Sequence, residues 1–208
     1  PLIHNNVLYN TAFIIFEGKI LGIVPKSYIP NYSEFYEKRW FTAAAMLTDE
    51  LVALPFQENI PFGTNLIFAA GDYKFGIEIC EDLWVTIPPS SYLSLLGANI
   101  IGNLSASNEL VSKKDYRLSL IANQSARCMS SYIYSSAGVH ESTTDLLFSG
   151  HLVISENGTI LKENNRFQRE NEVITSCIDV FKLNAERLKN LSYRDSSKIV
   201  PFKPKNIN

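Results

Sequence analysis

The feature that most constrains the fold of this chain is a strand–turn–strand pattern that occurs three times. Asn157-Gly158 separates two β-rich runs, and Asn-Gly is the strongest short signal for a β-hairpin, because both central residues of a type I′ turn need a positive φ. Gly71-Asp72 and the turn at 17–19 separate similar runs. The paired runs that we predict as strands are 11–16 with 20–24, 65–70 with 73–79, and 152–156 with 159–162. Antiparallel hairpins therefore form a large part of the fold.

Helical patterns lie between these hairpins. Apolar and small side chains recur at helical spacing from Leu118 to Met129, which is typical of an amphipathic helix. Ser90 can cap a second helix, which Gly97 would end. We predict helices over 113–130, from about 91 to 97 and over 180–191, and further strands over 98–101, 132–135 and 172–180. Strands that alternate with helices predict an α/β layered fold with antiparallel hairpins mixed into its sheets.

Composition excludes several classes of protein. A chain of 208 residues that is 46% hydrophobic can bury a core without disulfides or metals. The net charge of −2 and the lack of long Lys/Arg runs argue against a nucleic-acid partner. No apolar run approaches the roughly 18 residues of a membrane helix, so we expect no membrane partner. The odd, sparse set of three cysteines favours a reducing compartment, which predicts a cytoplasmic protein.

Cys80 is the strongest candidate for a reactive side chain. It follows the β-rich run 73–79 and precedes Glu81 and Asp82, so that a strand runs into a polar turn with a thiol at the corner. Such a corner can expose a side chain at a sheet edge and aim the next backbone N–H groups at the atom under attack. Neighbouring carboxylates disfavour a thiolate, so a nucleophile here needs a cation close by. Taken alone, a cysteine after a β-strand is more often a small buried hydrophobic residue than a nucleophile.

The other cysteines and the histidines carry weaker signals. Cys128 lies on the apolar face of a predicted helix and Cys177 in a predicted strand, so both are expected to be structural. His140 beside Glu141 could pair with Cys80, but the spacing does not support it. No Cys/His spacing indicates zinc, and we expect no metal site.

Two segments give the sequence a family resemblance. They are GIVPKSYIPNYSEFYEKRWF at 22–41 and GIEICEDLWVTIPPSS at 76–91, supported by NLSAS at 103–107, QSARC at 124–128 and ESTTDL at 141–146. In this order the five blocks resemble the glutaminase domain of bacterial glutamine-dependent NAD⁺ synthetases, a branch of the nitrilase superfamily. The resemblance extends from about residue 8 to about residue 169 and implies an αββα sandwich of two mixed β-sheets flanked by helices.

The resemblance also implies a catalytic triad of glutamate, lysine and cysteine. Cys80 matches the nucleophile that attacks the side-chain amide of glutamine, and Lys26 matches the lysine. An ammonium near the thiol would stabilise the thiolate and the oxyanion of the tetrahedral intermediate. Without the resemblance, Lys26 would be interpreted as a solvated loop lysine. Glu37 matches a second glutamate that orients the lysine, although it could equally be a surface carboxylate paired with Lys38 or Arg39.

The same resemblance implies which residues bind the α-amino and α-carboxylate groups of L-glutamine. They are Tyr32, Glu81 and Ser107, with Glu81 as a candidate partner for the ammonium. A basic residue beyond Ser107 would bind the carboxylate. This chain offers Lys113 and Lys114 where arginine is expected, and lysine cannot form arginine's two-pronged bond.

The catalytic glutamate of the family has no counterpart here. It belongs to the first βα unit, and Glu17, the only glutamate before Lys26, sits in a predicted hairpin turn. We therefore expect residues 1–200 to be a glutaminase domain that lacks its first N-terminal units, with a general base outside the chain. Residues 201–208 are expected to form a loose tail or the start of a linker to an absent synthetase domain. That domain, not this one, would use ATP, Mg²⁺ and deamido-NAD⁺, and the chain carries no Gly-rich pyrophosphate loop.

Three hypotheses remain open at this point. The first is the glutaminase domain, which would supply ammonia for the amidation of deamido-NAD⁺ to NAD⁺ within a homo-oligomer. The second is a stand-alone nitrilase-type amidase or carbamoylase with another amide substrate. The third is a non-catalytic assembly module, for which the missing glutamate would be unimportant.

Overall fold

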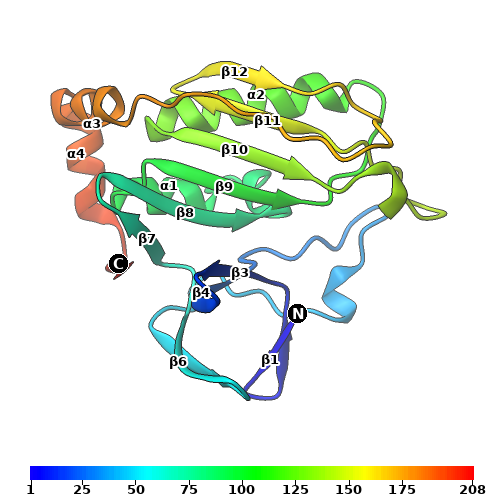
Figure 1. Ribbon diagram of the computed structural model, residues 1–208, viewed down its shortest axis with the longest axis horizontal. Helices are drawn as coiled ribbons and strands as arrows, with labels where there is room; N and C mark the ends of the chain where they lie inside the picture. The colour runs from blue at the N-terminus through cyan, green and yellow to red at the C-terminus, as the bar shows by residue number, and fades with distance from the viewer.

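A seven-stranded mixed sheet organises the chain. The computed structural model describes residues 1–208, and this sheet occupies the upper half of Figure 1. Its strand order is β12-β11-β10-β9-β8-β7-β13, in which β8–β9, β9–β10 and β7–β13 are parallel and the other pairs antiparallel. The strands are β7 (Leu66–Ala70), β8 (Tyr73–Ile79), β9 (Ile100–Ser105), β10 (Ser131–Ser136), β11 (Leu152–Glu156), β12 (Thr159–Glu163) and β13 (Lys205–Ile207).

A smaller four-stranded sheet lies below it. Its order is β3-β4-β6-β5, with β4 and β6 parallel and the outer pairs antiparallel. A separate hairpin of β1 and β2 packs beside it through Leu2 and Tyr9. These strands are β1 (Leu2–His4), β2 (Val7–Tyr9), β3 (Thr11–Phe16), β4 (Lys19–Pro25), β5 (Glu50–Leu54) and β6 (Gln57–Phe62).

Helices α1 (Pro89–Leu95) and α2 (Lys113–Cys128) cover one face of the seven-stranded sheet, while α3 (Val180–Lys189) and α4 (Leu191–Ser196) lie at one end of it (Figure 1). Leu93 of α1 and Ile121 of α2 pack on alternate residues of the strands, among them Ile101, Tyr132 and Val153. This alternation follows from the two-residue period of a strand, which sends every second side chain to the same face. The main core therefore lies between the sheet and these two helices.

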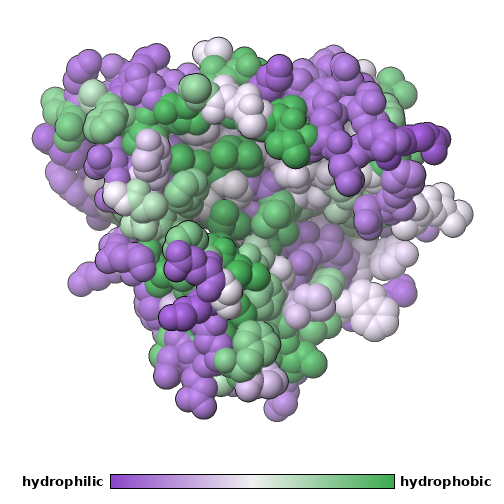
Figure 2. Space-filling model, in the orientation of Figure 1, coloured by the Kyte–Doolittle hydropathy of each residue, from purple (hydrophilic) through white to green (hydrophobic).

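The two sheets meet on the other face of the large sheet. Val24 of the small sheet packs against Leu66 and Phe68, and a second contact joins Ala12 with Ile79 and Cys80. The same face of the large sheet also carries half-exposed apolar side chains, and Figure 2 shows them as a hydrophobic band across the middle of the molecule. The site described below lies where the ends of β8 and β9 reach the small sheet.

The three hairpins and the three helices predicted from the sequence are confirmed. The hairpins are β3–β4, β7–β8 and β11–β12, and the helices are α1, α2 and α3. The predicted α/β class with two mixed sheets is confirmed as well. The hairpins β1–β2 and β5–β6 were not predicted, because the turns that join their strands, Asn5-Asn6 and Pro55-Phe56, lack the glycine of the other three turns.

Two predictions about the C-terminal part were wrong. Residues 172–179 are not a strand, because their backbone forms no ladder with another segment. The tail is not loose throughout, since Lys205–Ile207 form β13 at the edge of the large sheet. Asn65 holds it there: its carbonyl accepts the Lys205 N–H at 3.0 Å and its side-chain amide donates to the Lys203 carbonyl at 2.9 Å. Short-range patterns cannot reveal such a long-range pairing.

None of the helices combines the length and the apolar character required to cross a membrane.

Candidate active site

Cys80 lies at a strained corner at the end of β8. It begins the 3₁₀ turn Cys80–Leu83 and has a positive φ of 49°, a conformation that costs a non-glycine residue roughly 1–2 kcal/mol. The corner is held by side chains. Asp82 accepts the Ile79 N–H at 2.9 Å, and Asn103 accepts the Cys80 N–H at 3.2 Å. The predicted strand-to-turn position of Cys80 is thus confirmed, and the fold maintains the strain.

Asp82 also ties this corner to the loop that carries Lys26. Its carboxylate accepts the N–H groups of Ser27 at 3.3 Å and Tyr28 at 2.9 Å. Burial, and then the charge of Glu78, raise the pKa of Asp82 to about 7, while the three N–H donors favour the ionised form. Sequence reasoning did not assign a role to Asp82, because nothing local indicates which distant N–H groups it accepts.

Lys26 is buried rather than solvated. Its side chain is 1% exposed, and Nζ lies 2.8 Å from Oε2 of Glu37. A buried ammonium requires such a partner, because an unpaired charge away from water is costly. The alternative pairing of Glu37 with Lys38 or Arg39 is wrong. The contact matches the geometry expected of a glutamate that orients the lysine, and its catalytic role stays a prediction.

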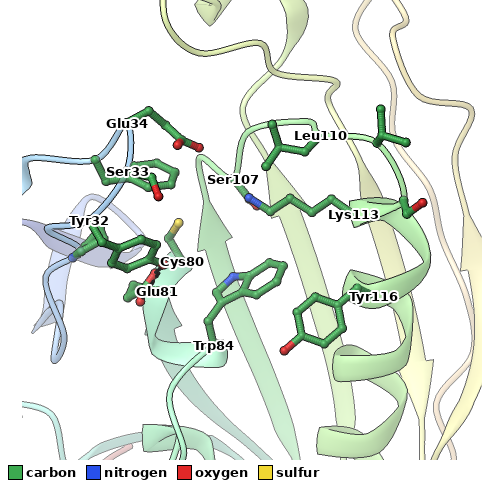
Figure 3. A pocket seen from close by; sticks show the side chains of 14 residues that line it. Tyr32, Ser33, Glu34, Cys80, Glu81, Trp84, Ser107, Leu110, Lys113 and Tyr116 are labelled. Carbon is green, nitrogen blue, oxygen red and sulfur yellow. Dashed lines mark hydrogen bonds between the residues drawn. The ribbon is translucent and has the colours of Figure 1, made fainter.

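A cavity of about 460 Å³ on one side of Cys80 brings together four of the five candidates for substrate binding; the fifth, Lys114, pairs with Glu163 at 2.7 Å instead. Tyr32, Glu81, Ser107 and Lys113 line it, and Figure 3 shows them around the Cys80 sulfur. The Tyr32 hydroxyl donates to both carboxylate oxygens of Glu81, at 2.9 and 3.1 Å. Burial and this bond raise the pKa of Tyr32, and burial raises that of Glu81.

The same cavity holds opposite charges and an unpaired hydroxyl. Lys113 reaches in from the start of α2, with Nζ 5.1 Å from the centre of the Trp84 ring. Burial, and then the charge of Arg117, lower the pKa of Lys113. Ser107 is 3% exposed and its Oγ has no hydrogen-bond partner. A buried unpaired hydroxyl is costly, so it favours a ligand that completes the bond.

Two further residues at this cavity were missed by sequence reasoning: Glu34, which lines it, and Asn108, which bonds to lining residues. Lys113 donates a hydrogen bond to the Oδ1 of Asn108, and the Nδ2 of Asn108 donates to Glu34. The loop with Tyr32 and the loop with Ser107 are thus bridged across the cavity. Both residues are sequence neighbours of predicted ones, and that adjacency was the only available signal.

A second cavity, of about 610 Å³, lies on the other side of Cys80. Lys26, Glu37 and Cys80 all line it, and Glu37 is the only carboxylate among its lining residues. Thr11 and Ser136 also line it, and each has a buried hydroxyl without a hydrogen-bond partner. Cys80 therefore separates a cavity with the buried lysine from one with a mixed-charge lining.

A buried charged cluster supports the loop of residues 107–112. Arg117 is fully buried and donates to Glu109 at 2.7 Å, to the Asn108 carbonyl at 3.3 Å and to Nδ1 of His151 at 2.8 Å. Nε2 of His151 lies 3.1 Å from Glu163. The sequence did not predict this cluster, although an arginine on the inner side of an amphipathic helix was a possible signal.

The remaining candidates lie away from the two cavities. Cys128 is buried, which raises the pKa of its thiol to about 11, and Cys177 is exposed. His140 does not contact Cys80, and its Nε2 lies 3.2 Å from the Arg169 carbonyl oxygen. Glu17 is exposed in the β3–β4 turn, at the opposite end of β3 from Thr11. The structure brings together no group of three or more His, Cys, Asp or Glu side chains that could hold a metal ion.

Comparisons with known proteins agree with this geometry. The model of the family described as "Carbon-nitrogen hydrolase" matches residues 2–185. The chain is 40% identical over 200 residues to the glutamine-dependent NAD(+) synthetase of Mycobacterium tuberculosis and 31% identical over 212 residues to that of Rattus norvegicus. These matches cover 94% and 97% of the chain but 29% of the length of each relative.

Solved structures give the same result. The glutamine-dependent NAD(+) synthetase from Cytophaga hutchinsonii matches with a TM-score of 0.71 and 25% identity, over 82% of this chain and 27% of that one. A carbon-nitrogen hydrolase from Helicobacter pylori G27 matches with a TM-score of 0.69 and 19% identity, over 89% of this chain and 62% of that one. The second match supports the fold alone.

Proposed function

Because the chain belongs to the carbon-nitrogen hydrolase family, we propose that it hydrolyses the side-chain amide of L-glutamine to glutamate and ammonia at Cys80. The observation that carries the proposal is the position of Cys80 between two cavities. One contains the buried Lys26, and the other has the charges that an amino acid requires. The names of the relatives support glutamine as the amide.

The mixed-charge cavity suits a zwitterionic substrate. Glu81 and Glu34 offer carboxylates for the α-ammonium group, while Lys113 and the unpaired Ser107 hydroxyl offer donors for the α-carboxylate. Lysine takes the place of the expected arginine, and it binds a carboxylate as a point charge. The charged residues of this cavity would contribute no binding energy for a simple amide that lacks these groups. The lining therefore argues against an amidase with a non-zwitterionic substrate.

The reaction would proceed through a thioester. The Cys80 thiolate attacks the amide carbon, a C–S bond forms, and the carbonyl oxygen becomes an oxyanion. The donors proposed to stabilise it are the Lys26 ammonium, which shares a cavity with Cys80, and the backbone N–H of Glu81, which follows Cys80 in the chain. The C–N bond then breaks and ammonia leaves after it takes up a proton. Water attacks the thioester, the C–S bond breaks, and glutamate departs with the thiol restored.

The group that accepts and returns the proton is proposed to be a glutamate outside these 208 residues. Glu17 is a poor candidate, because it lies four residues, or roughly 13 Å, along the chain from Phe13, the last residue of β3 that lines the cavity of Lys26. Glu37 is in that cavity but is already paired with Lys26 at 2.8 Å. A carboxylate that orients the lysine is poorly placed to serve also as the base.

For the whole protein, we propose that the ammonia is used to amidate deamido-NAD⁺ to NAD⁺. This rests on the relatives' names alone, since the chain spans 29% of their length. The synthetase domain that would bind ATP, Mg²⁺ and deamido-NAD⁺, the assembly into a homo-oligomer and the cytoplasmic location remain expectations of the same kind.

Selective labelling of Cys80 tests the proposal. A diazo-ketone analogue of glutamine should label Cys80 in the full-length polypeptide, and an excess of glutamine should protect it. Cys177 serves as an internal control, because it is exposed but lies in neither cavity. The modified residue is identified by peptide mass spectrometry. Labelling that is undiminished in Cys80→Ala, or that an N-carbamoyl amino acid blocks better than glutamine, would contradict the proposal.

A further inference from the structure

A row of polar side chains crosses the large sheet beneath α1 and ends at the backbone of Cys80. We infer that Glu78 and Tyr132 are positioning residues, which set the direction of the Asn103 side-chain amide so that its oxygen holds the Cys80 N–H. The inference rests on the proposed role of Cys80 as the nucleophile. Glu78, Tyr132 and Asn103 touch no substrate and act only through this backbone bond.

The row is built by the strand register. β8 and β9 are parallel, and Glu78 pairs with Asn103, so both side chains project to the same face of the sheet. On β10, the register partner of Asn103 is Tyr134. Tyr132 lies two residues before it, so the Tyr132 side chain projects to the same face of the sheet. All three side chains are at most 2% exposed. They therefore exchange hydrogen bonds with one another and not with water.

The hydrogen bonds run in one direction. The Cys80 N–H donates to Oδ1 of Asn103 at 3.2 Å, and Nδ2 of Asn103 donates to the Tyr132 hydroxyl at 3.0 Å. The Tyr132 hydroxyl donates to one carboxylate oxygen of Glu78. The other oxygen of Glu78 accepts the Ser90 N–H at 2.8 Å. The row of hydrogen bonds thus begins at the backbone N–H of Cys80 and ends at the backbone N–H of Ser90.

A carboxylate at the end of the row determines this direction. An ionised carboxylate can only accept, so Tyr132 must donate to Glu78 and is left to accept from the Asn103 amide. The NH₂ of Asn103 is thereby directed toward Tyr132, and its oxygen faces Cys80. If the amide rotated by half a turn, its NH₂ would meet the Cys80 N–H and the bond would be lost. Burial raises the pKa of Glu78, while the Tyr132 and Ser90 bonds favour its ionised form.

The backbone of Cys80 needs such a restraint. Its φ of 49° is unfavourable for a residue with a side chain, so the chain relaxes unless the surroundings hold it. Relaxation would move the sulfur away from Lys26 and turn the Glu81 N–H away from the oxyanion. A misplacement of about 1 Å can reduce a catalytic rate by up to about 100-fold. Substrate binding, which involves other residues, should be little affected.

Tyr132→Phe in the full-length polypeptide tests the inference, with Tyr134→Phe as the matched control. Both tyrosines are on β10 and at most 1% exposed, but the Tyr134 hydroxyl donates to Ser105 at 2.9 Å and lies outside the row. We expect Tyr132→Phe to lower kcat for glutamine hydrolysis roughly 10- to 100-fold with KM unchanged. Tyr134→Phe should keep kcat. Melting temperatures of both variants identify any general loss of structure.

Glu78→Gln provides a second variant with the same shape. If its NH₂ faces the Ser90 N–H, that hydrogen bond is lost. If its NH₂ faces the Tyr132 hydroxyl, the hydroxyl must accept instead of donate, and its own proton is free to turn toward the Asn103 amide. Either change disturbs the row, so Glu78→Gln should lower kcat as Tyr132→Phe does. Alkylation of Cys80 by iodoacetamide, which needs no substrate site, should slow in both variants. Slower alkylation in a protein that hydrolyses no glutamine would support the positioning role and refute the proposed function. Equal kcat and alkylation rates in Tyr132→Phe, Glu78→Gln and Tyr134→Phe would overturn the inference.

Discussion

At the scale of single residues, Lys26 decides how the site is interpreted. A lysine between a strand and a loop is ordinarily solvated, yet here it is buried against Glu37 and shares a cavity with Cys80. A buried cation beside a thiol compensates for the carboxylates that flank Cys80 in the sequence. The presence of Lys26 in the same cavity as Cys80 therefore supports a reactive cysteine more strongly than the position of Cys80 in the sequence does.

The first prediction concerns Lys26. In the full-length polypeptide, Lys26→Ala should reduce glutamine-dependent turnover at least about 100-fold, because the loss of one oxyanion donor alone costs about 10²–10³ in rate. Turnover with added ammonia should remain, since it would not use this site. The measurement compares both nitrogen sources in one assay of NAD⁺ formation. Lys38→Ala, which replaces an exposed lysine, is the control. Similar losses of turnover with glutamine and with ammonia would mean that Lys26 is structural.

The second prediction concerns His151, which is fully buried. Arg117 and Glu163 face its two ring nitrogens, and Tyr134 packs against the ring edge. Burial, and then the Arg117 guanidinium, lower the pKa of His151 to about 4 from 6.5. The unfolded chain therefore takes up the proton first as pH falls, so that stability present above pH 6.5 is lost progressively down to about pH 4.

This loss can be measured by denaturant unfolding. Between pH 7 and pH 5 the free energy of unfolding should fall by about 2 kcal/mol through His151 alone. His151→Gln should remove that part of the pH dependence, although it lowers stability at pH 7. His140→Gln should leave it intact, because His140 is exposed. A pH slope that is the same in both variants would contradict the assignment.

At the scale of elements, the site depends on the junction between the Cys80–Leu83 turn and the loop after β4. Asp82 accepts three backbone N–H groups, from Ser27, Tyr28 and Ile79, and so fixes the loop of the lysine against the turn of the cysteine. No strand ladder joins these two segments. A single carboxylate thus couples the positions of two candidate catalytic residues.

The third prediction is that Asp82→Asn loosens this junction. The new NH₂ group must face at least one of the three donors, and a buried N–H left without an acceptor costs about 1–3 kcal/mol. Amide hydrogen exchange at Ser27 and Ile79 should therefore accelerate roughly 10- to 100-fold, and glutamine turnover should fall. Asp72→Asn in the exposed β7–β8 turn is the control. Unchanged exchange at both amides would show that the loop is held by other contacts.

At the scale of the whole molecule, several large apolar side chains are exposed to solvent. β3 is an edge strand of the small sheet, and its Ile15 and Phe16 are 63% and 62% exposed. Phe75, Leu104 and Ile133 of the large sheet are also at least 37% exposed. An unpaired strand with apolar neighbours is a site for association with another chain.

The fourth prediction follows for a polypeptide that begins at Pro1 and ends at Asn208. It should show no glutaminase activity, because Glu37 is the only carboxylate in the cavity of Lys26 and is engaged with the lysine. It should also self-associate, as size-exclusion chromatography and binding of a hydrophobic dye would detect. The full-length polypeptide is the control. Glutamine turnover by the purified 208-residue chain, with its mass confirmed, would refute the assignment of an external base and point to Glu37.

Local sequence patterns were sufficient to predict the features that depend on near neighbours in the chain. The turns at Gly71-Asp72 and Asn157-Gly158 and the amphipathic α2 are local features, and periodicity and turn residues predict them directly. The resemblance singled out Tyr32, Glu81, Ser107 and Lys113 as substrate-binding residues; the structure brings them around one cavity with Cys80, and their role stays a prediction. Their spacing in the chain could not have done so.

The tertiary structure alone decided which distant groups face each other. It buried Lys26 against Glu37, placed Asp82 on the lysine loop, and joined Glu78, Tyr132 and Asn103 into one directed row. It also turned the predicted loose tail into β13 and left 172–179 without a strand partner. The physical reason is common to all of these cases. Hydrogen bonds and ion pairs form between groups whose separation depends on strand register and packing, and a linear sequence does not contain that distance.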